Sequence, residues 1–161
     1  RDFAAVLTFN ALVTVVQDLA RARAGGVERA INSLTRPGGQ TALWDGLGRA
    51  LEILASQAAS GRDPWVVCVT DGADNKSSSW NPKKLCKRIR STRNAPHNVN
   101  LVILSVGVDD RDAMARMRRV VDSVDDAHVG ELIDIQSGSQ IDDAFTRISA
   151  LVGGNLQVQQ Y

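Results

Sequence analysis

Hydrophobic residues recur along this chain with two different spacings, which predict two kinds of element. Short apolar runs rich in β-branched residues predict strands at Phe3–Phe9, Leu12–Val16, Trp65–Thr70, Val99–Val106 and Glu131–Ile135. Apolar residues three or four positions apart predict helices at Val27–Leu34, Leu43–Ala58, Pro82–Arg93, Arg111–Val121 and Ile141–Leu151. The first two strands are separated by a tight turn, so we expect them to pair as a hairpin.

The order of these elements predicts the fold class. Trp65–Thr70 is apolar up to its last residue, which is typical of a parallel strand covered by helices on both faces. From this strand onward, helices and strands alternate regularly. We therefore expect a three-layer α/β fold of Rossmann-like, doubly wound type, with a mostly parallel sheet and one antiparallel edge strand. Ligands of such sheets bind outside the carboxyl ends of the strands, and Asp71 follows one of these ends.

Composition fits one globular domain, because 43% of the 161 residues are hydrophobic and 23% are charged. We assign residues 1–152 to this domain and Gly153–Tyr161 to a C-terminal tail. The chain has no initiator Met and opens almost directly into a strand, so we expect it to be an N-terminally incomplete piece of a larger chain or complex. No apolar run reaches the length of a membrane span.

The net charge limits the classes of partner that we expect, and the cysteines indicate the cellular compartment. The net charge of +1 gives no overall attraction to nucleic acid or to anionic membranes, so a nucleic-acid partner is not expected. Cys68 and Cys86 lack the spacing of a zinc or redox site, and we interpret them as thiols of the core. Unpaired cysteines favour an intracellular location, while a secreted or extracellular one stays open.

Two polar loops contain the candidate chemistry. One is Gly38-Gly39-Gln40-Thr41 before the long helix, and the other is Thr70-Asp71-Gly72-Ala73-Asp74-Asn75 after the apolar strand. A hard cation such as Mg²⁺ prefers oxygen ligands, which the Thr41 hydroxyl and the Asp71 carboxylate can supply. The simpler interpretation is that Thr41 caps its helix and Asp71 begins a turn.

The order of these motifs resembles a known family. Thr8-Phe9-Asn10, Gly38-Gly39-Gln40-Thr41-Ala42-Leu43-Trp44-Asp45-Gly46-Leu47 and Thr70-Asp71-Gly72 follow one another as in von Willebrand factor type A domains. The resemblance covers nearly the whole chain. It implies a metal-ion-dependent adhesion site in which Thr41 and Asp71 are ligands of Mg²⁺, or of Mn²⁺ or Ca²⁺. We assign Gly39, Gln40, Gly72, Asp74 and Asn75 to the ligand-binding rim around it.

The family's remaining metal ligands lie in an Asp-x-Ser-x-Ser motif at the end of its first, central strand, and this sequence has no such motif. In the family's strand order, the strands Phe3–Phe9 and Trp65–Thr70 would flank an empty position. Unpaired backbone groups there would cost about 1 to 3 kcal/mol each if buried. We therefore expect the missing strand to come from an upstream segment or from another chain, and metal binding to depend on it.

Three further features have a functional and a structural interpretation. Asp45, in the first turns of the long helix, most simply complements the helix dipole. Trp44 and Trp80 could be binding anchors or core residues. The helix at Pro82–Arg93 could bind phosphate or an acidic partner, although a solvated outer face is the simpler interpretation; its basic residues are Lys83, Lys84, Lys87, Arg88, Arg90 and Arg93.

The function that these features favour is protein binding. The first hypothesis is an interaction module or scaffold that captures an acidic side chain of a protein partner through the cation. The alternative is a metal-free structural assembly domain within a larger complex. We expect no enzyme and no catalytic residues, because the sequence lacks a nucleophile elbow and a phosphate-binding glycine loop. His97 and His128 are predicted at the end of the sheet opposite Asp71.

Overall fold

The computed structural model describes residues 3–21, 25–33, 39–56, 64–91 and 99–157. These residues belong to two compact units. The first unit contains residues 1–57 and 74–81, and the second contains residues 58–73 and 82–161. The segment 74–81 therefore belongs with the N-terminal part of the chain, although it follows the third strand in sequence.

The first unit is built on an antiparallel hairpin of β1 (Phe3–Phe9) and β2 (Val13–Arg21), as predicted. Asn10 closes the turn, because its side-chain oxygen accepts a hydrogen bond from the amide of Leu12 at 3.0 Å. β2 is longer than the predicted Leu12–Val16. Its polar residues Gln17 and Asp18 interrupt the apolar run, but Gln17 pairs with Val6 and the ladder continues to Arg21, so the apolar run alone underestimates the strand.

Two helices complete this unit, α1 (Gly26–Asn32) and α2 (Leu43–Ser56). α2 carries the predicted apolar stripe, of which Leu43, Leu47 and Leu51 are buried. The helix approaches β1 closely, since a Cβ on Gly46 would lie 2.9 Å from the ring of Phe9. A hydrogen bond of 2.8 Å from the amide of Ala42 to the carbonyl of Asn10 ties the start of α2 to the hairpin turn.

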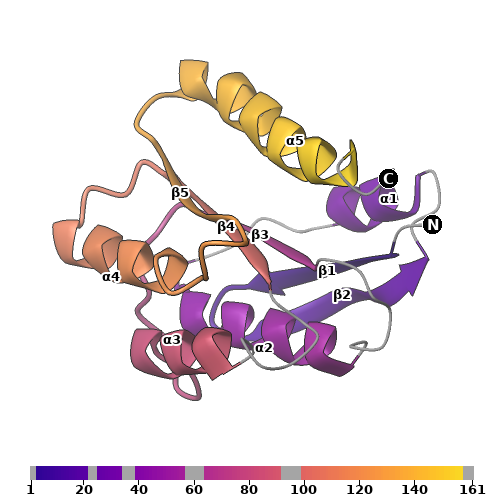
Figure 1. Ribbon diagram of the computed structural model, residues 1–161. Coiled ribbons are helices and arrows are strands. Elements are labelled where there is room, and N and C mark those ends of the chain that lie inside the picture. The colour runs from indigo at the N-terminus through magenta and orange to yellow at the C-terminus, as the bar shows by residue number, and fades with distance from the viewer. Residues whose placement is uncertain (1–2, 22–24, 34–38, 57–63, 92–98, 158–161) are drawn as a thin grey trace. The chain divides into compact units, whose positions relative to one another are not determined.

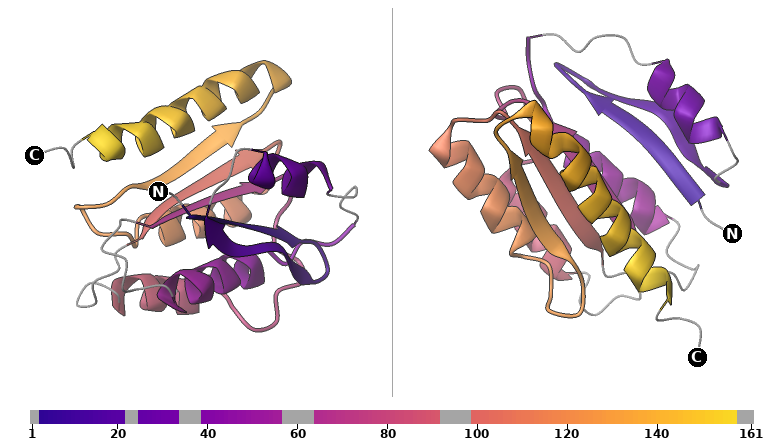
Figure 2. Two further views of the ribbon diagram at one scale, coloured as in Figure 1. Left: turned by 90° about the vertical axis from the view of Figure 1, so that its right-hand side faces the viewer. Right: turned by 90° about the horizontal axis from the view of Figure 1, so that it is seen from above.

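The second unit is a parallel sheet with strand order β3-β4-β5, as the alternation of elements predicts. Its strands are β3 (Trp65–Thr70), β4 (Asn100–Val106) and β5 (Gly130–Ile135). Helices α3 (Pro82–Ser91) and α4 (Arg111–Val121) cover one face of this sheet, and α5 (Ile141–Gln157) covers the other (Figures 1 and 2). A short 3-10 turn, η3 (Gly138–Gln140), leads into α5.

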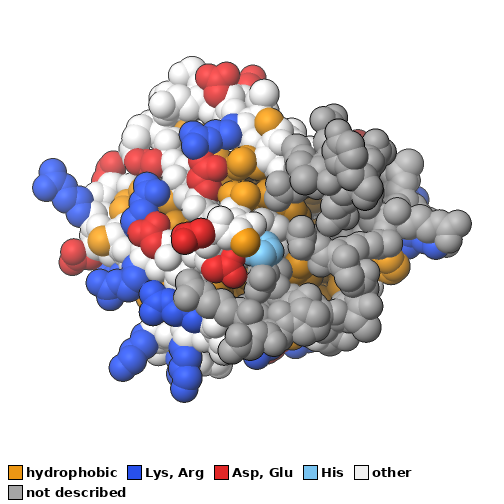
Figure 3. Space-filling model, viewed as in Figure 1, with side chains coloured by type: hydrophobic (Ala, Val, Ile, Leu, Met, Phe, Trp, Pro, Cys, Tyr) orange, Lys and Arg blue, Asp and Glu red, His pale blue; other side chains and the backbone are white. Residues whose placement is uncertain are grey.

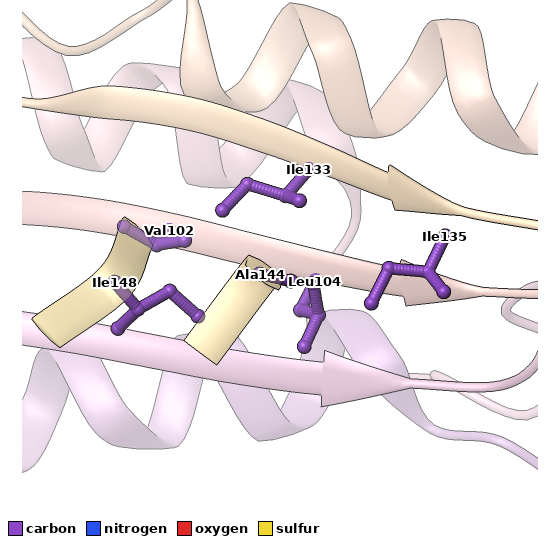
Figure 4. Close-up of a cluster of buried hydrophobic side chains, with 6 residues drawn as sticks. All are labelled: Val102, Leu104, Ile133, Ile135, Ala144 and Ile148. Carbon is purple, nitrogen blue, oxygen red and sulfur yellow. The ribbon is translucent and has the colours of Figure 1, made fainter. Parts of the chain in front are cut away.

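The core of this second unit lies on both faces of β4, whose first six residues are all buried. On the side of α5, branched side chains of β4 and β5 pack against Ala144 and Ile148 of the helix (Figure 4). Asn100 is a buried polar residue at the start of β4. Its side-chain oxygen accepts a hydrogen bond from the backbone amide of Val129 at 2.9 Å, and its own backbone amide donates to the carbonyl of Pro64 at 2.9 Å. Asn100 thus fixes the register where the three strands begin.

The α/β fold is confirmed, but the described strands form two sheets where one was predicted. In the described part of the chain, β1 and β3 share no ladder. Among the described strands, β3 pairs along one edge only, with β4. Val67 and Val69, on one face of β3, are 43% and 47% exposed, so this strand is less covered than a continuous apolar run predicts.

Most element bounds agree with the sequence, and β3 and α4 match it residue for residue. The largest difference is at the C-terminus, where α5 continues to Gln157 instead of ending at Leu151. Residues 153–157, the first part of the predicted tail, are therefore helical. Gly153 lies inside the helix, which is possible because a glycine there costs only about 1 kcal/mol relative to alanine. No helix in the described part of the chain is long and apolar enough to cross a membrane.

The contact between β5 and the end of α4 generates a first prediction. Gly130 packs so closely that an added Cβ would overlap the carbonyl oxygen of Val121. We expect Gly130→Ala to lower the free energy of unfolding by about 1 to 3 kcal/mol in urea denaturation, because backbone must move to admit the methyl group. Gly138→Ala is the matched control, since nothing lies within 4 Å of its Cβ position. Equal effects of the two substitutions would contradict this packing.

A second prediction concerns Cys68, whose side chain lies in β3 and is 5% exposed. Desolvation by burial raises the pKa of this thiol to about 12. The folded state therefore keeps the proton that the unfolded state releases above a pKa of about 8.5. Stability should fall by up to about 1.4 kcal/mol per pH unit as pH rises through this window. In urea titrations between pH 8 and pH 11, Cys68→Ala should show a shallower decline than the unsubstituted protein, and parallel declines would refute the assignment.

Candidate metal and partner-binding site

The loop at residues 74–81 is bound to the start of α2 by hydrogen bonds within the first unit. The side-chain oxygen of Asn75 accepts from the amide of Thr41 at 2.8 Å. In return, the carbonyl of Thr41 accepts from the amides of Asn75 at 3.0 Å and Lys76 at 3.2 Å. The backbone of Thr41 is thereby held on both its amide and its carbonyl side.

The same loop caps α2. The first amides of a helix have no partner inside it, and here two side chains of the loop supply the acceptors. Asp74 Oδ1 accepts from the amide of Trp44 at 3.4 Å and from the Ser77 hydroxyl at 2.5 Å. The Ser77 oxygen accepts from the amide of Asp45 at 3.0 Å. The cap expected from the Thr41 side chain is thus supplied by Asp74 and Ser77.

Asp45 has a different role from the predicted one. Its carboxylate accepts hydrogen bonds from three consecutive loop amides, Ser78 at 2.9 Å, Ser79 at 3.0 Å and Trp80 at 2.7 Å. Complementing the helix dipole is therefore not its main contact. Trp80 lies against α2, because a Cβ on Gly48 would overlap its indole ring.

The two tryptophans of this region serve packing. Trp44 is 4% exposed, and Trp80 is half-buried against Gly48. Of the two interpretations of these residues, the structure supports core packing over exposed binding anchors.

Asp71 lies in the second unit, directly after β3. The preceding Thr70 is buried, and its hydroxyl donates to the carbonyl of Gly72 at 2.9 Å. The amide of Gly72 points back to the same hydroxyl at 3.4 Å. This closed turn fixes the backbone around Asp71 and leaves its side chain exposed at the carboxyl end of a parallel strand.

The predicted site residues with side-chain oxygens differ in whether those oxygens already accept hydrogen bonds. Within the described residues, the Thr41 hydroxyl and the Asp71 carboxylate have no hydrogen-bond or ion-pair partner, whereas Asp74 and Asn75 are engaged with α2. Gly39 and Gln40 are exposed, and Gly39 has a φ of 65°, which favours glycine. No group of three or more His, Cys, Asp or Glu side chains that could hold a metal occurs in the described ranges.

His128 lies in the second unit, at the opposite end of the sheet from Asp71. It precedes β5, whereas Asp71 follows β3, and the strands are parallel. Its Nδ1 lies 2.7 Å from Asp125 Oδ1, so the imidazole braces the turn before β5. His97 lies outside the described residues.

The network around Asp45 generates a third prediction. Asp45→Ala leaves three loop amides without their acceptor, so we expect the free energy of unfolding to fall by about 2 kcal/mol. Glu52→Ala is the matched control on the same helix, because the exposed pair of Glu52 with Arg49 should contribute less than about 1 kcal/mol. Urea denaturation measures both variants, and a loss at Asp45 no larger than that at Glu52 would show that the loop is held in another way.

Comparison with solved structures shows what this arrangement resembles. The SpRpn10 VWA domain matches with a TM-score of 0.65 at 18% identity, over 90% of this chain and 71% of that one. Proximal thread matrix protein 1 from the mussel byssus, with a zinc-occupied MIDAS motif, matches with a TM-score of 0.68 at 20% identity. That match covers 92% of this chain and 34% of the matrix protein, so this chain spans about a third of its length. At these identities the likeness concerns the fold.

A search of curated proteins gives no significant match. The family model of the von Willebrand factor type A domain, in contrast, matches residues 2–146, which is most of the chain. The match includes the hairpin, the loop before α2 and all strands of the parallel sheet. The chain therefore belongs to the von Willebrand factor type A domain family.

Proposed function

We propose that this chain is a protein-interaction module that binds its partner through a Mg²⁺-type cation, with Thr41 and Asp71 among the ligands. The observation that carries the proposal is the state of the Thr41 hydroxyl. In the polar cluster at the start of α2, the side chains of Asp45, Asp74, Asn75 and Ser77 all make hydrogen bonds within the unit, whereas the half-buried Thr41 hydroxyl makes none with the residues that the structure describes. The backbone amide and carbonyl of Thr41 are both hydrogen-bonded, so the position of the residue is fixed while its hydroxyl oxygen is available to a ligand.

Asp71 supports the proposal from the second unit. Its carboxylate is exposed, and the turn around it is closed by Thr70. Pairing Thr41 with Asp71 in one site rests on the order of the family's motifs along the sequence, and not on a distance between the two side chains. When bound, the cation supplies an open coordination position that a carboxylate of the partner can fill.

Two protein oxygens do not complete a coordination shell of about six. We propose that the family's Asp-x-Ser-x-Ser strand, absent from the sequence, comes from an upstream segment or from another chain. The free edge of β3 among the described strands supports this idea, because an added strand would pair that edge. Metal binding then depends on that strand.

The second candidate is a metal-free assembly domain within a larger complex. It is favoured by the engagement of Asp74 and Asn75, because one side-chain oxygen of each already accepts a hydrogen bond from an amide at the start of α2. Both candidates assign binding, and not turnover, to this chain. The pairing of His128 with Asp125 at the opposite end of the sheet supports that choice, because it separates the imidazole from Asp71.

The fourth prediction is that metal binding requires the missing strand, and a calorimetric titration with Mg²⁺ and with Mn²⁺ tests it. We compare the 161-residue chain with a longer form that includes the native sequence upstream. We expect the longer form alone to bind, and Thr41→Ala or Asp71→Ala to abolish binding, since each removes a ligand oxygen. Thr41→Ser keeps the hydroxyl and should retain binding, and so should Asp126→Ala, which removes an exposed carboxylate before β5.

The outcomes separate the two candidates. No binding by a folded longer form would contradict the metal proposal and favour the metal-free assembly domain. Binding that survives both Thr41→Ala and Asp71→Ala would show that the cation occupies a different site. Circular dichroism of each variant confirms that a lost signal reflects a lost ligand and not a lost fold.

A further inference from the structure

Helix α3 in the second unit carries a strongly basic outer face. It contains five positive side chains and no acidic one, and its buried residues are Leu85, Cys86 and Ile89. At 100° per residue, three of the basic residues fall within about 60° of one another, on the flank of the helix that adjoins Cys86. We call them the α3 basic stripe; they are Lys83, Lys87 and Arg90, and all three are exposed.

The surroundings of the stripe add to its charge. The thiol of Cys86 lies 3.5 Å from the carbonyl of Arg119, so the last turn of α4 lies beside the middle of α3. That turn contains Arg118 and Arg119, both exposed. Figure 3 shows the lysine and arginine side chains gathered over this part of the second unit. No described carboxylate forms an ion pair with the three stripe residues.

The charge arrangement is unfavourable for the helix itself. Lys83 lies in the first turn of α3, where the helix dipole is positive and an acidic residue would stabilise. Lys83 and Lys87 are four positions apart, so they lie on the same side and repel each other. A merely solvated surface does not need such a distribution, and a partner of opposite charge would relieve both repulsions.

From this geometry we propose that the α3 basic stripe docks an extended acidic segment of a protein partner. Lys83 and Lys87 are separated by four helical residues, about 6 Å along the axis. Alternate side chains of an extended strand on one face are about 6.6 Å apart. The spacing of carboxylates at alternate positions of an extended segment is therefore close to the spacing of Lys83 and Lys87 along the helix. This contact is independent of the cation proposed above.

The observations favour a polypeptide over a nucleic acid. α3 has no aromatic side chain on which a base could stack. α4 beside it carries the exposed acids Asp112 and Asp122 at its two ends, which would repel a continuous phosphate backbone. A short acidic peptide that follows α3 alone avoids both of them.

The experiment measures binding of a fluorescein-labelled peptide with glutamate and serine alternating over eight residues, by fluorescence anisotropy at two salt concentrations. We expect binding that weakens as salt increases. The triple variant Lys83→Gln, Lys87→Gln, Arg90→Gln should bind about tenfold more weakly. The matched control Arg21→Gln, Arg49→Gln, Arg147→Gln removes the same charge from other exposed positions and should bind as the unsubstituted protein does.

Urea denaturation accompanies the binding measurement. The triple variant should be as stable as the unsubstituted protein or slightly more stable, because it removes repulsion within α3. Absence of peptide binding, or equal weakening by the two triple variants, would overturn the proposal. Tighter binding of a 20-nucleotide single strand or duplex than of the peptide, lost on the α3 substitutions, would overturn it in favour of nucleic acid.

Discussion

Backbone amides and carbonyls that leave water need partners, and at the ends of elements in this chain side chains supply several of them. Asp45 accepts from three consecutive amides and so holds the loop at residues 74–81 in the first unit. Asn100, fully buried, bonds the segments that lead into β3 and β5 in the second unit. Both side chains bind backbone groups that have no partner within a helix or a strand ladder. The positions of the loop residues and of the strand starts depend on these two side chains.

The sequence predicts best what local periodicity determines. β3 and α4 have the predicted bounds because a dense β-branched run and a regular apolar stripe each admit one interpretation. It predicts less well what long-range pairing determines. β2 continues through Gln17 because β1 pairs with it, and α5 continues through Gly153 although glycine usually marks a helix end. The division of the described strands into two sheets also depends on pairing, which periodicity does not indicate.

The candidate site shows the same division. The resemblance indicated Thr41 and Asp71 as metal ligands, and we assigned Asp74 and Asn75 to the rim around them, but residue type does not tell which oxygens the fold itself uses. Asp74 and Asn75 are used by α2, and Asp45, which the sequence analysis assigned to the helix dipole, holds the loop. A signal was present in the run Ser77-Ser78-Ser79, because small polar residues expose consecutive amides that a carboxylate can bind. Sequence distance hid the pairing, since more than thirty residues separate the partners.

The net charge of the chain does not describe the charge of its individual surfaces. The value of +1 led us to expect no electrostatic attraction to a polyanion, yet that value is a sum over surfaces that face different directions. The positive charges of α3 are offset by acids elsewhere in the second unit, including Asp142 and Asp143 in the first turn of α5. α5 covers the opposite face of the sheet, with the β3-β4-β5 layer between it and α3 (Figure 1). Since salt screens charges beyond about 8 to 10 Å, a partner at α3 meets the local charge of that helix and not the sum.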